Sequence, residues 1–124
     1  MFAETDVIPL FPTFVWTFDL APKVSAKINS RVLKRVEHVL PKLSTPKPDS
    51  YPYQSEPNLH EHKDFKDLAD IIVKACESLC QDMQVVHDGL DITGLWVNIA
   101  KPGEIHKQHN HPNNYFSAVY YVDI

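Results

Sequence analysis

The stretch Glu104-Ile-His-Lys-Gln-His-Asn-His-Pro-Asn-Asn-Tyr-Phe-Ser-Ala-Val-Tyr-Tyr-Val122 brings three of the chain's seven histidines close together, as His106, His109 and His111. If Glu104 to His111 is extended, alternate side chains point to opposite faces, so His109 and His111 share one face and His106 lies on the other. Two neutral imidazoles at i and i+2 suit one divalent metal ion, which could be iron, zinc, copper or nickel. The sequence therefore predicts a metal-binding pair at His109 and His111, completed by a third ligand from elsewhere.

The same residues also fit a plainer interpretation. An exposed polar loop rich in His and Asn, closed by Pro112-Asn113-Asn114, would have the same composition. Two strand-like runs flank the histidines, Ile92 to Ala100 and Tyr115 to Val122, and they favour a rigid mount over a loose loop. The metal-binding interpretation is preferred, and the surface loop stays open as its alternative.

Length and charge set the outer limits. A chain of 124 residues predicts one domain with a core of its own. The formal net charge is −4 and no basic block is present, so neither nucleic acid nor a membrane surface is the expected partner.

The N-terminal residues and the two cysteines indicate the cellular compartment that the sequence predicts. The first residues carry acids where a signal peptide would carry bases, and no apolar run reaches the roughly 18 residues that span a bilayer. Cys76 and Cys80 stand at i and i+4 in a helical pattern, where a disulfide is awkward and a role in the core is expected. These features predict a soluble, cytoplasmic protein with reduced thiols.

The N-terminal half predicts an edge strand, a helix and a long connection. Thr13 to Phe18 is rich in aromatic and β-branched residues beside prolines, which favours an edge strand. Apolar residues at helical spacing predict a helix from about Pro22 to Leu40. Five of the ten prolines then lie between Pro41 and His62, so this stretch is a connection. It is either a plain surface linker or a cover for a site, with Tyr51, Tyr53, Gln54 and His60 as candidate lid residues.

A second helix begins near Lys63 and carries an apolar stripe that includes Met83. We expect it to end at His87-Asp88-Gly89, where glycine supplies a left-handed conformation. The strand that follows alternates along Ile92 to Ala100, and Pro102-Gly103 predicts a tight turn into the histidine segment. The predicted core residues are the stripe of the second helix and the inward face of this strand: Phe65, Leu68, Ile72, Leu79, Leu95, Val97 and Ile99.

Tyr115 to Val122 alternates as a further strand. Helices followed by antiparallel strands indicate an α+β fold, in which two N-terminal helices pack on an antiparallel sheet. We expect a single domain over residues 1–124, with a helical part at 1–90 and a sheet part at 91–124.

The motifs resemble a known family, the iron(II)- and 2-oxoglutarate-dependent oxygenases, in a largely uncharacterised branch. The resemblance covers most of the chain. It rests on Pro9-Leu-Phe-Pro-Thr-Phe-Val-Trp16, on Tyr53-Gln-Ser55 with Leu59, on Trp96-Val-Asn98-Ile, and above all on His106-x-x-His109-x-His111-Pro with Ser117-Ala-Val-Tyr-Tyr-Val122. The resemblance implies a double-stranded β-helix (jelly roll), of which residues 91–124 would be the start.

The resemblance also implies roles for single residues. His109 matches the first iron ligand, and His111 stands where the wider superfamily carries a carboxylate. Tyr121 matches a strand tyrosine that binds 2-oxoglutarate, and Asn98 faces the site in some relatives. The implied cofactors are Fe(II) and 2-oxoglutarate, with ascorbate assisting, and the implied activity is hydroxylase-type oxidation of an unknown small-molecule or peptide substrate. His106 is expected to support the ligands or to lie at the surface.

The family pattern continues with a distal histidine and a basic residue that would follow Ile124. We therefore expect the chain to be the N-terminal portion of an oxygenase, inactive by itself, with an exposed strand edge that promotes self-association, for instance as a homodimer. Two alternatives stay open. One is a non-catalytic cupin or jelly-roll domain that binds a metal or another ligand, and the other is a fragment with no autonomous function.

Overall fold

The computed structural model describes residues 6, 11, 13–37 and 50–122 of the chain. Its elements, in order, are α1 (Pro22–Val36), β1 (Tyr53–Gln54), the 3-10 helix η2 (Leu59–Glu61), α2 (Lys66–Asp82) and β2 (Asn98–Ile99). Two helices with one small antiparallel sheet make the predicted α+β class correct at this level.

Helix α1 begins at the predicted residue. Pro22 occupies its first turn, where a missing backbone N–H costs nothing and the fixed φ suits a helix. Lys34 and Arg35 stand in the last turn, where positive charge complements the helix dipole. The helix ends at Val36, and the rest of the predicted range, up to Leu40, lies largely outside the described residues.

Helix α2 ends earlier than predicted, and glycine plays no part in ending it. Its last residue is Asp82, and Gln84 adopts a left-handed φ of 56°. The backbone N–H of Gln84 donates to Gln81 and that of Val85 donates to Cys80, at 3.1 and 2.8 Å, which is the hydrogen-bond pattern of a Schellman motif. The expected end at Gly89 is therefore wrong, because Gln84 takes the conformation expected of glycine.

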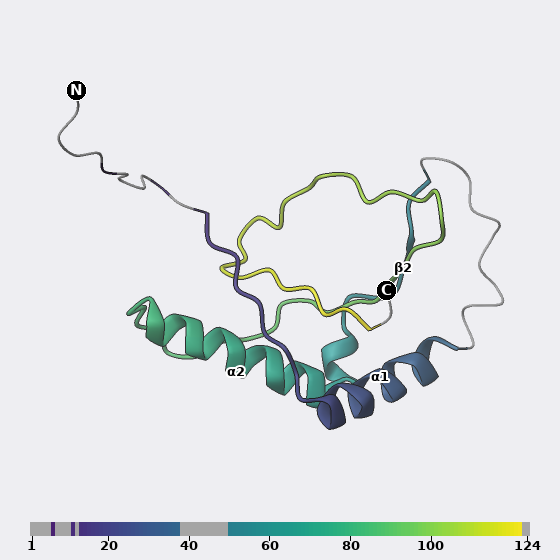
Figure 1. Cartoon of the computed structure of the whole chain (residues 1–124), viewed down its shortest axis with the longest axis horizontal. Coiled ribbons are helices and arrows are strands. Elements are labelled where there is room, and N and C mark those ends of the chain that lie inside the picture. The colour runs from purple at the N-terminus through teal and green to yellow at the C-terminus, as the bar shows by residue number, and fades with distance from the viewer. Residues whose placement is uncertain (1–5, 7–10, 12, 38–49, 123–124) are drawn as a thin grey trace.

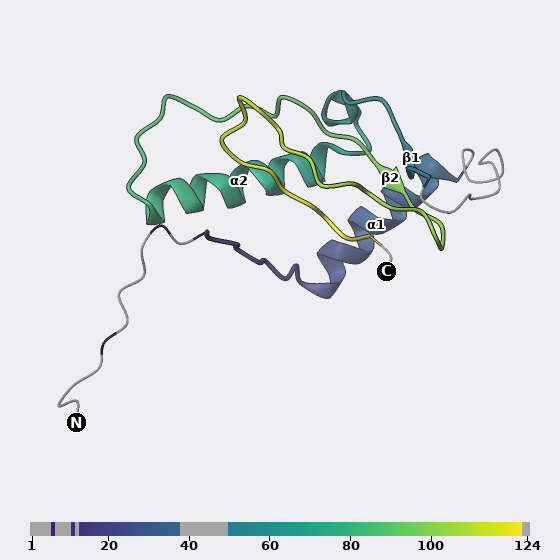
Figure 2. The ribbon, with the colours of Figure 1, turned by 90° about the horizontal axis from the view of Figure 1, so that it is seen from above.

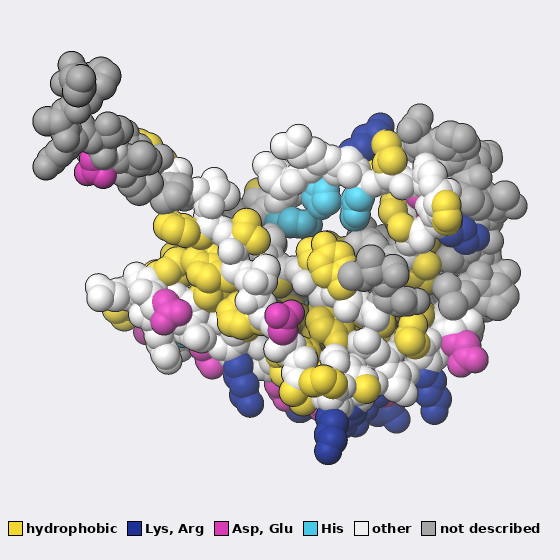
Figure 3. Space-filling model, viewed as in Figure 1, with side chains coloured by type: hydrophobic (Ala, Val, Ile, Leu, Met, Phe, Trp, Pro, Cys, Tyr) yellow, Lys and Arg dark blue, Asp and Glu magenta, His cyan; other side chains and the backbone are white. Residues whose placement is uncertain are grey.

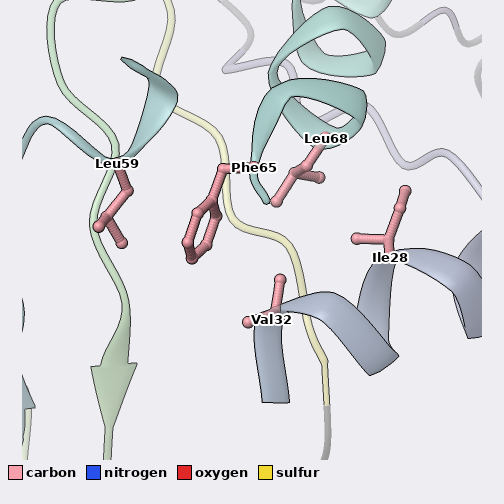
Figure 4. Close-up of a cluster of buried hydrophobic side chains, with 5 residues drawn as sticks. All are labelled: Ile28, Val32, Leu59, Phe65 and Leu68. Carbon is pink, nitrogen blue, oxygen red and sulfur yellow. The ribbon is translucent and has the colours of Figure 1, made fainter. Parts of the chain in front are cut away.

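The core lies between the two helices and η2 (Figure 4). Ile28 and Val32 of α1 face Phe65 and Leu68 at the start of α2, and Leu59 of η2 closes the cluster. Phe65 and Leu59 are almost completely buried, with 1% and 2% of their surface exposed. Later segments also reach this cluster, since the partly buried Leu95, Val97, Tyr120 and Val122 pack against it. Residues from both predicted parts of the chain thus share one core.

The predicted core is confirmed for three of its seven residues. Phe65, Leu68 and Leu79 are buried. Ile72 of α2 is only half-buried, and so are Leu95, Val97 and Ile99, whose segment pairs on one side alone in the described chain. Cys80 is buried, Cys76 is half-buried, and both are free thiols, as predicted.

The sheet joins the proline-rich connection to the segment before the histidines. β1 pairs antiparallel with β2, with Tyr53 opposite Ile99 and Gln54 opposite Asn98. The contact continues past the strands, where Ser55 N–H donates to Val97 and Leu59 N–H donates to Leu95, both at 3.0 Å. The prolines around β1 concealed this strand from sequence reasoning, since they confine it to an edge. The end of the connection is a structured part of the fold.

Three predicted strands are wrong in the described chain. Thr13 to Phe18, Glu104 to His111 and Tyr115 to Val122 form no ladder, and the predicted strand at Ile92 to Ala100 is reduced to β2. Their alternating residues indicate extended backbone, but a strand also needs a neighbour for its N–H and C=O groups. Tyr115 to Val122 reaches α1 through side chains instead. The jelly roll stays a prediction.

The two helices meet at an angle along the lower side of the molecule in Figure 1, and the segments after α2 form a wide loop above them. In the view from above, β1 and β2 lie over the end of α1 (Figure 2). Within the described residues, neither helix has the length and apolar character needed to cross a membrane.

Candidate metal and ligand site

Two tight turns frame the histidine segment. At the first, Glu104 N–H donates to the Lys101 carbonyl at 3.0 Å, with Pro102 and Gly103 between them and Gly103 at a φ of 90°. Proline followed by a residue of positive φ is typical of a type II turn. The predicted turn at Pro102-Gly103 is therefore confirmed. The Glu104 carboxylate also accepts the Lys101 backbone N–H at 2.8 Å, which holds the turn closed.

The second turn repeats this arrangement. Asn114 N–H donates to the His111 carbonyl at 3.3 Å across Pro112 and Asn113, and Asn113 has a φ of 67°. Asparagine tolerates this region better than most residues. Thr93 donates its hydroxyl to the Asn114 side chain at 2.8 Å and ties the turn to the chain before β2. Both ends of the histidine segment are thus fixed.

The segment between the turns is attached to the chain before β1. Ile105 N–H donates to the Ser50 carbonyl at 2.9 Å. Lys107 places its ammonium over the Tyr51 ring, 5.5 Å from the centroid. The end of the proline-rich connection therefore supports the histidines directly.

His109 and His111 meet through their Nε2 atoms, which lie 3.2 Å apart. Two imidazoles bound to one metal ion at the usual distance of about 2.0 to 2.1 Å place their nitrogens about 2.9 Å apart at a right angle and about 3.4 Å apart at the tetrahedral angle. The observed separation falls between these values. The separation of the two nitrogens is therefore compatible with adjacent positions around a single metal ion.

The protonation of His109 also suits a ligand. Its Nδ1 lies 2.9 Å from the Lys107 carbonyl oxygen, which only accepts, so Nδ1 carries the proton and Nε2 presents a lone pair. Metal-bound histidines generally donate their other ring N–H in this way, which fixes the tautomer and the ring orientation. In the absence of metal, His111 donates its Nε2–H to this lone pair.

His106 does not lie where the alternation argument placed it. Its ring stacks on that of His109, with centroids 4.9 Å apart and an interplanar angle of 26°. The expectation of opposite faces is wrong, because the segment is no regular strand and period-two alternation does not apply. The His109 ring therefore contacts both other histidines, because it stacks on His106 and meets the ring of His111 edge-on.

Trp96 orients the second member of the pair. Its ring lies 5.5 Å from that of His111 at an angle of 45°. The Trp96 ring also lies close to Gly94, where an added Cβ would come within 3.3 Å of it. Glycine at position 94 thus lets the indole fold back toward the chain while it contacts the imidazole.

These side chains surround a cavity of about 410 Å³, within the range of small-molecule sites. Its described lining consists of Tyr51, Gln54, Trp96, His106, Lys107, Gln108, His109 and His111. Figure 3 shows histidine side chains gathered around a hollow in the surface. Two of the four candidate lid residues, Tyr51 and Gln54, line it, whereas Tyr53 and His60 do not. Lys107 was missed, although its place between His106 and His109 was a usable signal.

The two predicted 2-oxoglutarate residues are not part of this lining. Tyr121 is 69% exposed, and Asn98 is exposed in β2 opposite Gln54. The neighbouring Tyr120 points the other way, into the core region, and donates its hydroxyl to Asn29 Oδ1 of α1 at 2.7 Å. Burial raises the pKa of the Tyr120 phenol above its ordinary value. The roles of Tyr121 and Asn98 stay predictions.

Among the described residues, no group of three or more His, Cys, Asp or Glu side chains is placed to hold a metal ion. The pair fits a metal by its separation and by the tautomer of His109. A third protein ligand is not identified in the part of the chain that the structure describes.

Comparison with known proteins finds a similarity in the C-terminal segment. Residues 94–124 match the family model described as "Putative 2OG-Fe(II) oxygenase". The predicted oxygenase resemblance is confirmed for this segment. The match includes Trp96, both histidines of the pair and the two turns that hold them, whereas Tyr51 and Gln54 of the cavity lie outside it. No curated protein and no solved structure matches the chain.

Proposed function

We propose that His109 and His111 bind Fe(II) and that the chain carries part of the site of a 2-oxoglutarate-dependent oxygenase acting on a small molecule or peptide. One observation carries the proposal: the two Nε2 atoms lie 3.2 Å apart within the segment that matches the oxygenase family. Because catalytic metal sites usually have three protein ligands, we expect this pair alone to hold the metal with modest affinity.

The chemistry follows the family assignment. Bound iron would supply dioxygen activation, in which one oxygen atom enters succinate as 2-oxoglutarate loses CO2 and the other enters a substrate C–H bond. The chain's own residues would hold the ligands. Lys107 fixes the tautomer of His109 through its carbonyl, and Trp96 packs against His111.

The first experiment measures metal binding. Co(II), a stand-in for Fe(II) that is stable in air, is titrated into the chain and into the His109→Ala, His111→Ala and His106→Ala variants by calorimetry. We expect His109→Ala and His111→Ala each to weaken Co(II) binding by about 100-fold or more. His106→Ala should weaken it less, since the loss of a residue that supports a ligand lowers metal affinity by about 10- to 100-fold. Equal losses for all three variants would contradict the pair.

The second experiment separates an oxygenase from a plain metal-binding domain. 2-Oxoglutarate is titrated into the Co(II)-loaded chain, with succinate as the matched control, because succinate lacks the keto group that completes a chelate. We expect 2-oxoglutarate binding that needs both Co(II) and His109. Metal binding without any preference for 2-oxoglutarate over succinate would argue for a non-catalytic domain. The expectation that this chain alone has no turnover stays a prediction, tested by succinate formation with Fe(II) and ascorbate.

A further inference from the structure

The cavity beside the histidine pair carries an uneven charge. Of its eight described lining residues, Lys107 is the one lysine, and none is Asp or Glu. The other lysines with a described ion pair, such as Lys27 and Lys66, bind carboxylates of α2. Within the described chain, the contact found for the Lys107 ammonium is the Tyr51 ring. Its positive charge thus faces the cavity without a carboxylate to neutralise it.

The Tyr51 ring holds this ammonium without using its hydrogen bonds. At 5.5 Å from the centroid the attraction acts through the face of the ring. The three N–H donors of a lysine therefore stay available for an anion. The aromatic contact restricts the side chain beforehand, which lowers the entropy lost when a ligand binds.

The main chain fixes the position of Lys107 relative to the metal pair. Its carbonyl oxygen accepts a hydrogen bond from Nδ1–H of His109 at 2.9 Å. Two residues before it, the Ile105 N–H donates a hydrogen bond to the Ser50 carbonyl. A ligand that reaches both the ammonium and the histidine pair would therefore span a set distance. The Lys107 ammonium and the histidine pair thus belong to one short segment, which the two turns hold at its ends.

Neutral donors stand on the same cavity. Gln54 of β1 and Gln108 each bring an amide that can donate to an oxygen anion. Tyr51 and Trp96 supply apolar ring surface for the body of a small ligand. A carboxylate with an apolar body fits this combination of one cation, amide donors and aromatic walls.

We propose that Lys107, with Tyr51 and Gln54, forms a carboxylate subsite in the cavity beside the histidine pair. The carboxylate belongs either to an acidic substrate or to the far end of the cosubstrate. The link to the metal rests on the proposed function, whereas the subsite itself does not depend on a bound metal.

Two arms of one experiment distinguish the two sources. In the first arm, phenylacetate is titrated into the metal-free chain in the presence of EDTA. In the second arm, 2-oxoglutarate is titrated into the Co(II)-loaded chain. Both arms use the wild type, Lys107→Gln, Lys107→Arg and a matched control, Lys74→Gln, which removes the same charge from an exposed position on α2. Circular dichroism checks that the variants keep their helices.

We expect Lys107→Gln to weaken carboxylate binding by about 10- to 100-fold, the usual size of a lost charge-assisted hydrogen bond. Lys107→Arg should recover most of the affinity, and Lys74→Gln should match the wild type. A loss confined to phenylacetate assigns the subsite to the substrate, and a loss that includes 2-oxoglutarate assigns it to the cosubstrate. Equal effects of the two Gln variants, or no binding of either probe, would overturn the proposal. If Co(II) does not bind, the phenylacetate arm still tests the subsite, so the two proposals fail separately.

Discussion

The indole of Trp96 packs against the imidazole of His111, with ring centroids 5.5 Å apart and planes inclined at 45°. Among the residues that the structure describes, the ring of His111 also contacts that of His109, through the edge that carries Nε2. Trp96 thus limits how His111 rotates while its Nε2 atom stays directed at the pair. The segment Trp96-Val-Asn98-Ile is linked to the histidines by this contact as well as by the chain.

The first prediction concerns this contact. Trp96→Leu should weaken Co(II) binding by about tenfold, in the range found for residues that orient metal ligands, because His111 loses the ring that restrains it. Trp96→Phe keeps an aromatic face and should lose less. Calorimetry on both variants measures the difference. Unchanged affinity in Trp96→Leu would show that the turn at Pro112 orients His111 without help.

The second prediction concerns the core. Phe65 is 1% exposed and Leu68 is 6% exposed, and both face α1. Phe65→Ala should lower the free energy of unfolding by about 3 to 5 kcal/mol, and Leu68→Ala by about 2 to 5 kcal/mol, because each leaves a cavity between the helices. Urea denaturation followed by circular dichroism measures both. Val86→Ala, at a position that is 96% exposed, is the control and should change little. A loss below about 1 kcal/mol for both core variants would mean that the helices do not dock here.

The third prediction concerns the end of α2. Gln84 stands at a φ of 56°, a conformation that costs a residue with a Cβ about 1 kcal/mol relative to glycine. Gln84→Gly should therefore raise the free energy of unfolding by several tenths to about 1 kcal/mol. Gln81→Gly, inside the same helix, should lower it by a similar amount. Destabilisation by Gln84→Gly would show that the Gln84 side chain has a role beyond ending the helix.

The fourth prediction concerns acid stability. The Asp67 carboxylate lies 2.7 Å from Lys27 and 2.8 Å from Arg31, and these contacts between α2 and α1, the Lys27 hydrogen bond first, lower its pKa below 3.8. A depressed carboxylate pKa stabilises the fold above the unfolded pKa, and this stability is lost as pH falls through the folded value.

The melting temperature of Asp67→Asn should therefore change less with pH than that of the wild type below about pH 4. The difference in melting temperature between the two should be largest at neutral pH. Asp70→Asn is the matched control, because its carboxylate pairs with Lys66 at 3.7 Å on the exposed face of the same helix. Thermal melts between about pH 2 and 7 measure the effect, which should shrink in high salt. Identical pH profiles for the wild type and Asp67→Asn would contradict it.

The helices and turns were predictable because their signals are local. Pro22 marks the start of α1, the apolar stripe around Leu68 marks the buried face of α2, and Pro102-Gly103 specifies its turn without reference to distant residues. The strands were not predictable in the same way. Alternation along Tyr115 to Val122 indicates extended backbone, but pairing depends on which segment lies alongside, and β1 was concealed by its neighbouring prolines.

The site shows the same division. Closely spaced histidines were sufficient to select His109 and His111, whose nitrogens do meet. Whether His106 shares their side depends on the backbone path between two turns, and a strict strand model gave the wrong side. The contribution of Lys107 depends on Tyr51, which a long proline-rich stretch separates from it in sequence. Contacts of this kind need the folded chain.

The hydrogen bond between the Tyr120 hydroxyl and the Asn29 side chain joins positions 91 residues apart. The Asn29 side-chain amide in turn donates a hydrogen bond to the Val122 carbonyl at 3.0 Å. The last described residues are thereby fastened to the first helix, and almost everything between them forms one closed ring. The entropy of closing such a ring rises only slowly with its length, as about (3/2)RT ln n, but the search that brings its ends together is slow. The histidine segment lies just before this closing point. We therefore expect this segment to be among the last parts of the chain to become ordered during folding. A metal ion bound there would then stabilise the folded chain only after the ring has closed, and would slow its reopening.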